Sequence, residues 1–227
     1  MSLFTLPYWT AMFSATAPKA LLVSALACGP AQKPPSVAMT FTPSQPQVTH
    51  TLDHQALGQF SVSTQFSHHR NEVFLTGGIT ESNIRTDYNV NFEQHIDQRT
   101  NQACLYVDHI QLTLHYDPVV HIASNYPQGS CRFKTTWQHE LLHVNTDLIT
   151  LNERKQLLEQ AAQQVAQKLT VIGPVDAAAL PLQQQAVIDQ VGAAVQTTFE
   201  GIDKLRMQRQ QLIDTREEYL RLSKACP

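Results

Sequence analysis

The segment His139-Glu140-Leu141-Leu142-His143 has the residue types and the spacing of a hydrolytic metal site, HExxH. Residues four apart lie on one face of a helix, so His139 and His143 can reach a single metal ion. Glu140 lies beside them, where it can accept a proton from a metal-bound water. The sequence therefore predicts a zinc-binding helix with Glu140 as general base. The alternative is a half-buried helix with two solvated histidines.

The third metal ligand is harder to identify. A catalytic zinc usually has three protein ligands and an open position for water, but no histidine follows His143 in the chain. Asp147 lies one turn beyond His143, and we expect it to hold an imidazole N–H, unless it is a solvated aspartate. The other candidates for a third ligand or an outer hydrogen-bond partner are Gln208, Gln211, Asp214, Glu200, Asp203, His109, His115 and His121.

The helical pattern places these residues. A helix is predicted from about 135 to 170, with Thr135 or Thr136 as N-cap, and it stops at Gly173-Pro174. A second long helix is predicted from 181 to about 211, and a capping box at 214–218 opens a short final helix. If the long helices run antiparallel, the histidines face residues 208–212, which makes Gln208, Gln211 and Asp214 neighbours of the metal.

Before the helices, the pattern is extended. Apolar and polar residues alternate near 60–62 and 88–92, and a short apolar run at 73–75 ends at two glycines. The alternation recurs in Leu105–His115, where Ile110, Leu112 and Leu114 share one face. Asp117-Pro118 is predicted to be a turn before a short strand at 119–123. We expect an α+β fold with a small, mostly antiparallel sheet at about 50–125, then the metal helix and an antiparallel helical hairpin. Residues 50–226 would form one domain, β-rich over 50–130 and helical over 131–226.

The N-terminus resembles an export signal. Lys19 precedes an apolar run that ends in Ala-x-Ala at Ala27, a layout that predicts cleavage after residue 27. The run is too short for a membrane span, and a buried N-terminal helix is the alternative. Residues 28–49 are rich in proline and predict a flexible tether. The mature protein is therefore expected to be exported, either periplasmic or a membrane-anchored lipoprotein.

Four cysteines bear on this interpretation. Cys28 directly follows the predicted cut, so it is either the lipidated first residue of a lipoprotein, which would anchor the chain in an outer or inner membrane, or a thiol left by a general signal peptidase. Outside the cytoplasm disulfides persist. A bridge between Cys104 and Cys131 is predicted, because it would fix the metal helix to the sheet. Cys226 would then be free or joined to Cys28.

The composition limits the classes of function. A chain of 227 residues with 42% hydrophobic content can bury a substantial core. The net charge is −3 and the Lys and Arg residues are scattered, which argues against nucleic acid as a partner. A peptide or protein substrate is the expected partner.

The segment from Cys131 through His139–Val144 resembles a group of exported bacterial proteins described as secreted zinc proteases or as domains of unknown function. In that group a cysteine precedes HExxHV, and the tail from Ile213 to Cys226 is also similar. The resemblance implies a zincin-like metal helix packed on a small sheet. Relatives have a histidine shortly before the Asp-Thr pair, where this chain has Gln210 and Gln211; if that histidine is their third ligand, this chain lacks it.

Two functions follow from these patterns. The first is a zinc-dependent metallopeptidase of the bacterial cell envelope. The second is a non-catalytic envelope lipoprotein or binding protein that keeps the HExxH scaffold. Metal analysis of the purified protein would separate the two.

Overall fold

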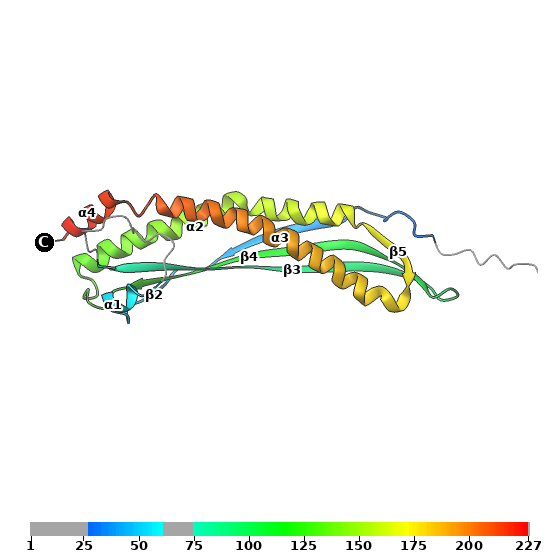
Figure 1. Cartoon of the computed structure of the whole chain (residues 1–227), viewed down its shortest axis with the longest axis horizontal. Coiled ribbons are helices and arrows are strands. Elements are labelled where there is room, and N and C mark those ends of the chain that lie inside the picture. The colour runs from blue at the N-terminus through cyan, green and yellow to red at the C-terminus, as the bar shows by residue number, and fades with distance from the viewer. Residues whose placement is uncertain (1–26, 61–74, 227) are drawn as a thin grey trace, which may run out of the picture.

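The computed structural model describes residues 27–60 and 75–226. A sheet forms one layer and two long helices form the other, so that the described part of the molecule is elongated (Figure 1). In chain order the elements are β1 (Ser36–Pro43), β2 (Gln47–Thr49), α1 (His54–Leu57), β3 (Gly78–Asp97), β4 (Gln102–Ile122), α2 (Cys131–Lys168), β5 (Val171–Asp176), the 3₁₀ turn η1 (Ala177–Ala179), α3 (Leu180–Gln211) and α4 (Arg216–Lys224).

The α+β class holds, but the prediction of a small, mostly antiparallel sheet was wrong. β1 and β2 both pair in parallel with β4, so the strand path β1-β4-β2 is parallel throughout. β3 and β5 add antiparallel pairs to β4, and β3 and β4 are 20 and 21 residues long. A parallel pair needs a long crossover connection. The partners are therefore distant in sequence, as Ser36 and His109 are, and local alternation cannot reveal them.

The predicted tether at 28–49 was also wrong, because it contains β1 and β2. Val37, Met39 and Phe41 of β1 pack against the main core. Pro35 precedes the strand and Pro43 ends it, positions at which a missing N–H does little harm to a ladder. The proline content that suggests a linker here marks the ends of strands.

A single strand also replaces the turn predicted at Asp117-Pro118. The backbone N–H of Ser44, just after β1, donates to the carbonyl of Tyr116. The backbone groups of Tyr116 therefore point to the side of β4 on which β1 lies. Alternate residues of a strand direct their N–H groups to the same side. Pro118 therefore faces the interval between β1 and β2, where its missing N–H removes no ladder bond.

The helices largely follow the sequence pattern. The three predicted helices are present as α2, α3 and α4, with Ser130 rather than Thr135 or Thr136 as the N-cap of α2. Thr215 caps α4 by accepting from the N–H of Glu218. The long helices run antiparallel across one face of the sheet (Figure 1).

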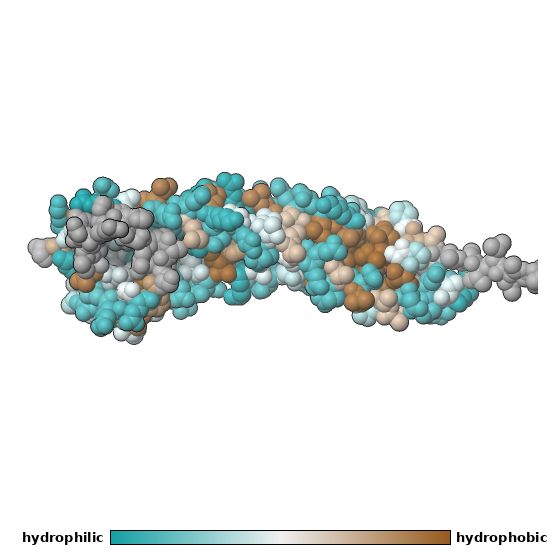
Figure 2. Space-filling model, in the orientation of Figure 1, coloured by the Kyte–Doolittle hydropathy of each residue, from teal (hydrophilic) through white to brown (hydrophobic). Residues whose placement is uncertain are grey.

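The core lies between these two layers. Alternate residues of β4, including Ile110, Leu112 and Leu114, are buried against Val144, Leu151 and other apolar residues of α2 and α3. The surface in the same view is mainly hydrophilic, with hydrophobic residues gathered over the first part of α3 (Figure 2). α2 thus has one face fixed on the sheet and another turned toward α3.

The cysteines pair as Cys28–Cys104 and Cys131–Cys226, so the predicted Cys104–Cys131 bridge was wrong. Cys104 lies near the start of β4, whereas Cys131 begins α2 at the opposite end of the molecule (Figure 1). The sulfur of Cys28 is in a disulfide, which is inconsistent with lipidation, one of the two alternatives left open for this residue. Two disulfides point to an oxidising, extracellular type of environment.

The export signal predicted for residues 1–27 lies, except for Ala27, outside the described residues, as do the extended segments predicted at 62 and at 73–74. Within the described residues no helix is both long enough and apolar enough to span a bilayer.

Candidate metal centre

His139 and His143 converge on the side of α2 that faces the segment after α3. Their imidazole rings lie 5.0 Å apart between centroids, and their Nε2 atoms are 3.3 Å apart. The two residues are only 4% and 7% exposed. The alternative of two solvated histidines is therefore wrong.

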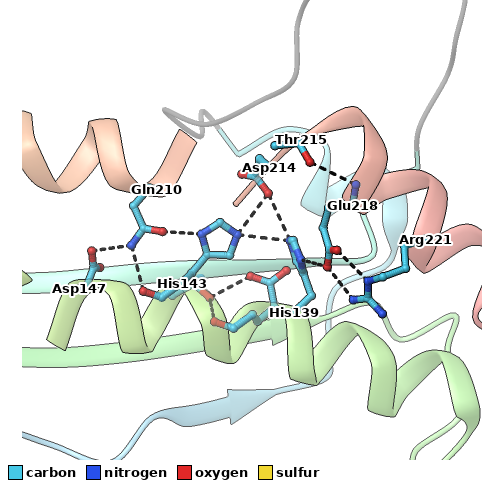
Figure 3. A network of polar contacts seen from close by, with 10 residues as sticks. His139, His143, Asp147, Gln210, Asp214, Thr215, Glu218 and Arg221 are labelled. Atoms are coloured by element: carbon cyan, nitrogen blue, oxygen red, sulfur yellow. Dashed lines mark hydrogen bonds and ion pairs between the residues drawn. The ribbon is translucent and has the colours of Figure 1, made fainter. Parts of the chain in front are cut away.

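Asp214 completes a group of three at this point. It lies between α3 and α4, where the return of the hairpin brings it level with the histidines, and it is 8% exposed. Its Oδ1 atom is 3.2 Å from the Nε2 atoms of both His139 and His143 (Figure 3). This buried His139–His143–Asp214 group could bind a metal ion.

The spacing of the three atoms suits a small divalent cation. Ligands at about 2.0–2.1 Å from a tetrahedral zinc lie about 3.3–3.4 Å from one another. The three separations here are 3.2, 3.2 and 3.3 Å. The residues therefore fit a metal without any large rearrangement.

Outer hydrogen bonds fix how the two imidazoles are oriented. His139 Nδ1 donates to Glu218 Oε1 at 3.2 Å, and Arg221 holds that carboxylate in turn. His143 Nδ1 donates to Gln210 Oε1 at 2.5 Å. With both protons on Nδ1, both Nε2 lone pairs face the Asp214 carboxylate (Figure 3). Metal-binding histidines typically have such outer partners, and three acceptor atoms facing one another require a cation or a proton between them.

The charges around the site favour positive charge on the histidines. Burial by itself lowers the pKa of His143, but its hydrogen bond to Asp214 and the negative charges of Glu140 and Asp214 together raise it to about 9. The pKa of His139 is also raised, because Asp214 and Glu140 outweigh the effect of burial. Without a metal ion, the negative charge around the site therefore favours the protonated form of the imidazoles.

Glu140 lies on the sheet side of the histidines and outside the group of three. Thr80 of β3 donates its hydroxyl to Glu140 Oε2 at 2.8 Å. Gly78 lets β3 come this close, since a Cβ there would lie 2.8 Å from Glu140 Oε1. Burial raises the pKa of this carboxyl. The glutamate is held beside the centre by a neutral donor.

Asp147 and Gln211 do not lie next to the metal group. Asp147 is fully buried and accepts from Ser82, Arg206 and Gln210. The expectation that it holds an imidazole N–H was wrong, because Gln210 stands between its side chain and the ring of His143. Gln211 is exposed. Neighbouring positions of a helix are rotated by about 100° from each other. Gln210, which the sequence analysis named with Gln211 but did not choose as a site residue, is the one that faces inward.

The remaining candidates lie outside the site. His109, His115 and His121 are on the face of β4 turned away from the long helices, where they contact Ser36, Thr42 and Thr49. Asp203 pairs with Arg206, and Glu200 accepts from Gln196. The sequence analysis gave Glu218 a place only in the capping box at 214–218 and assigned no site role to Tyr219.

Comparison with known proteins gives no match to a family model, to a curated protein or to a solved structure. The centre must therefore be interpreted from its own geometry.

Proposed function

We propose that this protein is a zinc-dependent hydrolase in which Glu140 is the general base. The observation that carries the proposal is the set of three buried ligand atoms, 3.2–3.3 Å apart, beside a carboxylate that is not among them. A second carboxylate held next to a metal site is what proton transfer from water requires.

The donor set supports a catalytic rather than a structural centre. Structural zinc sites usually have four ligands and are rich in cysteine, whereas catalytic sites have three ligands drawn from His and carboxylate. Here all four cysteines are in disulfides, and the ligands are two histidines and an aspartate. A zinc ion held there would lower the pKa of a bound water.

A peptide is the substrate class that the surroundings favour. Among the described residues β3 pairs with β4 alone, which leaves its other edge without a strand partner. Thr80 of this strand contacts Glu140 directly. An extended peptide can add to such an edge through main-chain hydrogen bonds, which would carry it past the glutamate. We therefore infer a metallopeptidase.

The proposed place of action is the cell envelope. The apolar run ending at Ala27 has the layout of an export signal, and the two disulfides agree with an oxidising compartment. A periplasmic protein without a lipid on Cys28 is the form consistent with the disulfide of that residue.

The test measures metal content and peptide hydrolysis in the purified chain. We expect one equivalent of zinc, its loss in His139→Ala, and its retention in Glu140→Gln together with a loss of roughly 10²–10⁴-fold in turnover. Glu217→Gln, an exposed carboxylate on α4, is the control and should change neither quantity. A wild-type chain that binds no zinc, or full turnover in Glu140→Gln, would contradict the proposal.

A second function is favoured by the burial of the centre. The two histidines, Asp214 and Glu140 are only 4–8% exposed, and α4 lies against the ring of His139. A metal there could serve to fix α4 on α2 in a non-catalytic envelope protein that binds a partner. Chelation that frees α4 from α2, in a chain whose zinc-loaded form hydrolyses no peptide, would select this function.

A further inference from the structure

The segment after α3 supplies three of the groups around the metal centre. Asp214 offers the carboxylate oxygen, Glu218 accepts from His139, and the ring of Tyr219 lies 6.2 Å from the ring of His139. Both histidines belong to α2. The centre is therefore complete only while residues 212–226, here called the C-terminal strap, stay against the first turns of α2.

Apolar packing by itself holds α4 only weakly against α2. None of the residues 216–224 is buried, whereas α3 has six buried residues. A helix of nine residues is also shorter than the length at which helices become stable by themselves. The position of α4 therefore depends on its contacts with His139 and on ties at its two ends.

The metal group is the tie at one end, and the Cys131–Cys226 disulfide is the tie at the other. Cys131 is the first residue of α2, about two turns before His139, and Cys226 follows α4. Cys226 is buried, with its sulfur 3.7 Å from the Thr135 hydroxyl. The disulfide thus holds the far end of the strap on the same helix that carries the histidines.

We propose that the Cys131–Cys226 disulfide positions the strap for metal binding, so that the centre binds its metal tightly only in the oxidised chain. The inference rests on the proposed metal centre. Forming the bond removes two electrons and two protons from the two thiols, which a disulfide-bearing oxidant accepts by thiol–disulfide exchange. Metal loading then follows arrival in an oxidising compartment.

The size of the effect follows from what the reduced chain would lose. It keeps His139, His143 and Asp214, but Glu218 is no longer held on the Nδ1 atom of His139. Loss of such an outer partner typically weakens metal binding roughly 10–100-fold. Because coupling between two equilibria is reciprocal, bound metal must protect this disulfide against reduction by the same factor.

The Cys28–Cys104 disulfide is a matched control within the chain. It joins the segment before β1 to β4, at the end of the molecule far from the strap (Figure 1). A variant without it lacks one disulfide, as a variant without Cys131–Cys226 does. Its metal group, however, is unchanged.

The first experiment measures zinc affinity by competition with a chromophoric chelator. We expect a loss of roughly 10–100-fold in Cys131→Ser/Cys226→Ser and an unchanged affinity in Cys28→Ser/Cys104→Ser. Equal affinities in the two double variants would overturn the inference and leave the metal centre standing. A wild type that binds no zinc would overturn both.

The second experiment needs no variant, and so it does not depend on whether a variant folds. The wild-type chain is brought to equilibrium with a thiol–disulfide redox buffer, with and without zinc, and the free thiols are alkylated and identified by mass spectrometry. Zinc should lower the equilibrium ratio of reduced to oxidised Cys131–Cys226 by roughly 10–100-fold and leave that of Cys28–Cys104 unchanged. Equal protection of both bonds, or of neither, would contradict the proposal.

Discussion

At the scale of single residues, the centre depends on a glutamine. Gln210 accepts from His143 Nδ1 and donates to the His143 carbonyl and to Asp147. Its amide therefore sets which nitrogen of His143 carries the proton and leaves Nε2 for the metal. Arg206 and Ser82 hold Asp147 in turn, so the orientation of one imidazole is tied to both β3 and α3.

Gln210→Ala should weaken zinc binding roughly 10–100-fold, because His143 loses the partner that fixes its proton and ring. Gln211→Ala, one position along and exposed, should leave the affinity unchanged. Chelator competition measures both variants. Equal affinities would show that Gln210 does not orient His143.

At the scale of elements, α2 combines the core and the site in one helix. Val144, Leu151 and Leu158 pack on the sheet, while His139 and His143 face the segment after α3. Since the same backbone carries both faces, packing of the apolar face determines where the imidazoles point. Packing in the core therefore keeps the metal site rigid.

Leu158→Ala should lower the free energy of unfolding by about 2–5 kcal/mol, since it removes a side chain that is 1% exposed and leaves a cavity. Its neighbour Leu157 is 40% exposed, and Leu157→Ala should change stability by no more than about 0.5 kcal/mol. Urea denaturation of the two variants provides the comparison. Similar losses in both would mean that α2 is not packed as described.

At the scale of the whole molecule, distant segments are held together by pairing and by disulfides. β1 lies beside β4 in parallel register, and the Cys28–Cys104 bond spans 76 positions of sequence. Such a bond restricts the unfolded chain more strongly than a local one does.

Cys28→Ser/Cys104→Ser should therefore lower the free energy of unfolding by about 2–5 kcal/mol. Denaturation by urea, followed by circular dichroism, measures the loss against the oxidised wild type. An unchanged midpoint would mean that pairing of β1 with β4 holds the N-terminal segment without the bond.

Local sequence patterns were sufficient to predict the helices and the part of the metal centre that lies on α2. The 3.6-residue periodicity and the Thr215 cap gave α2, α3 and α4, because hydrogen bonds and caps of a helix join residues that are close in sequence. HExxH gave His139, Glu140 and His143 for the same reason. Asp214 could be reached as one of several candidates, once an antiparallel hairpin was assumed.

The sequence by itself determined the helices, the facing pair of histidines and the presence of four cysteines. Only the tertiary structure decided that β1 and β2 join the sheet in parallel, that Gln210 rather than Gln211 faces inward, and which cysteines pair. The physical reason is separation along the chain. Contacts between residues far apart are set by how whole layers pack, and no local periodicity encodes them.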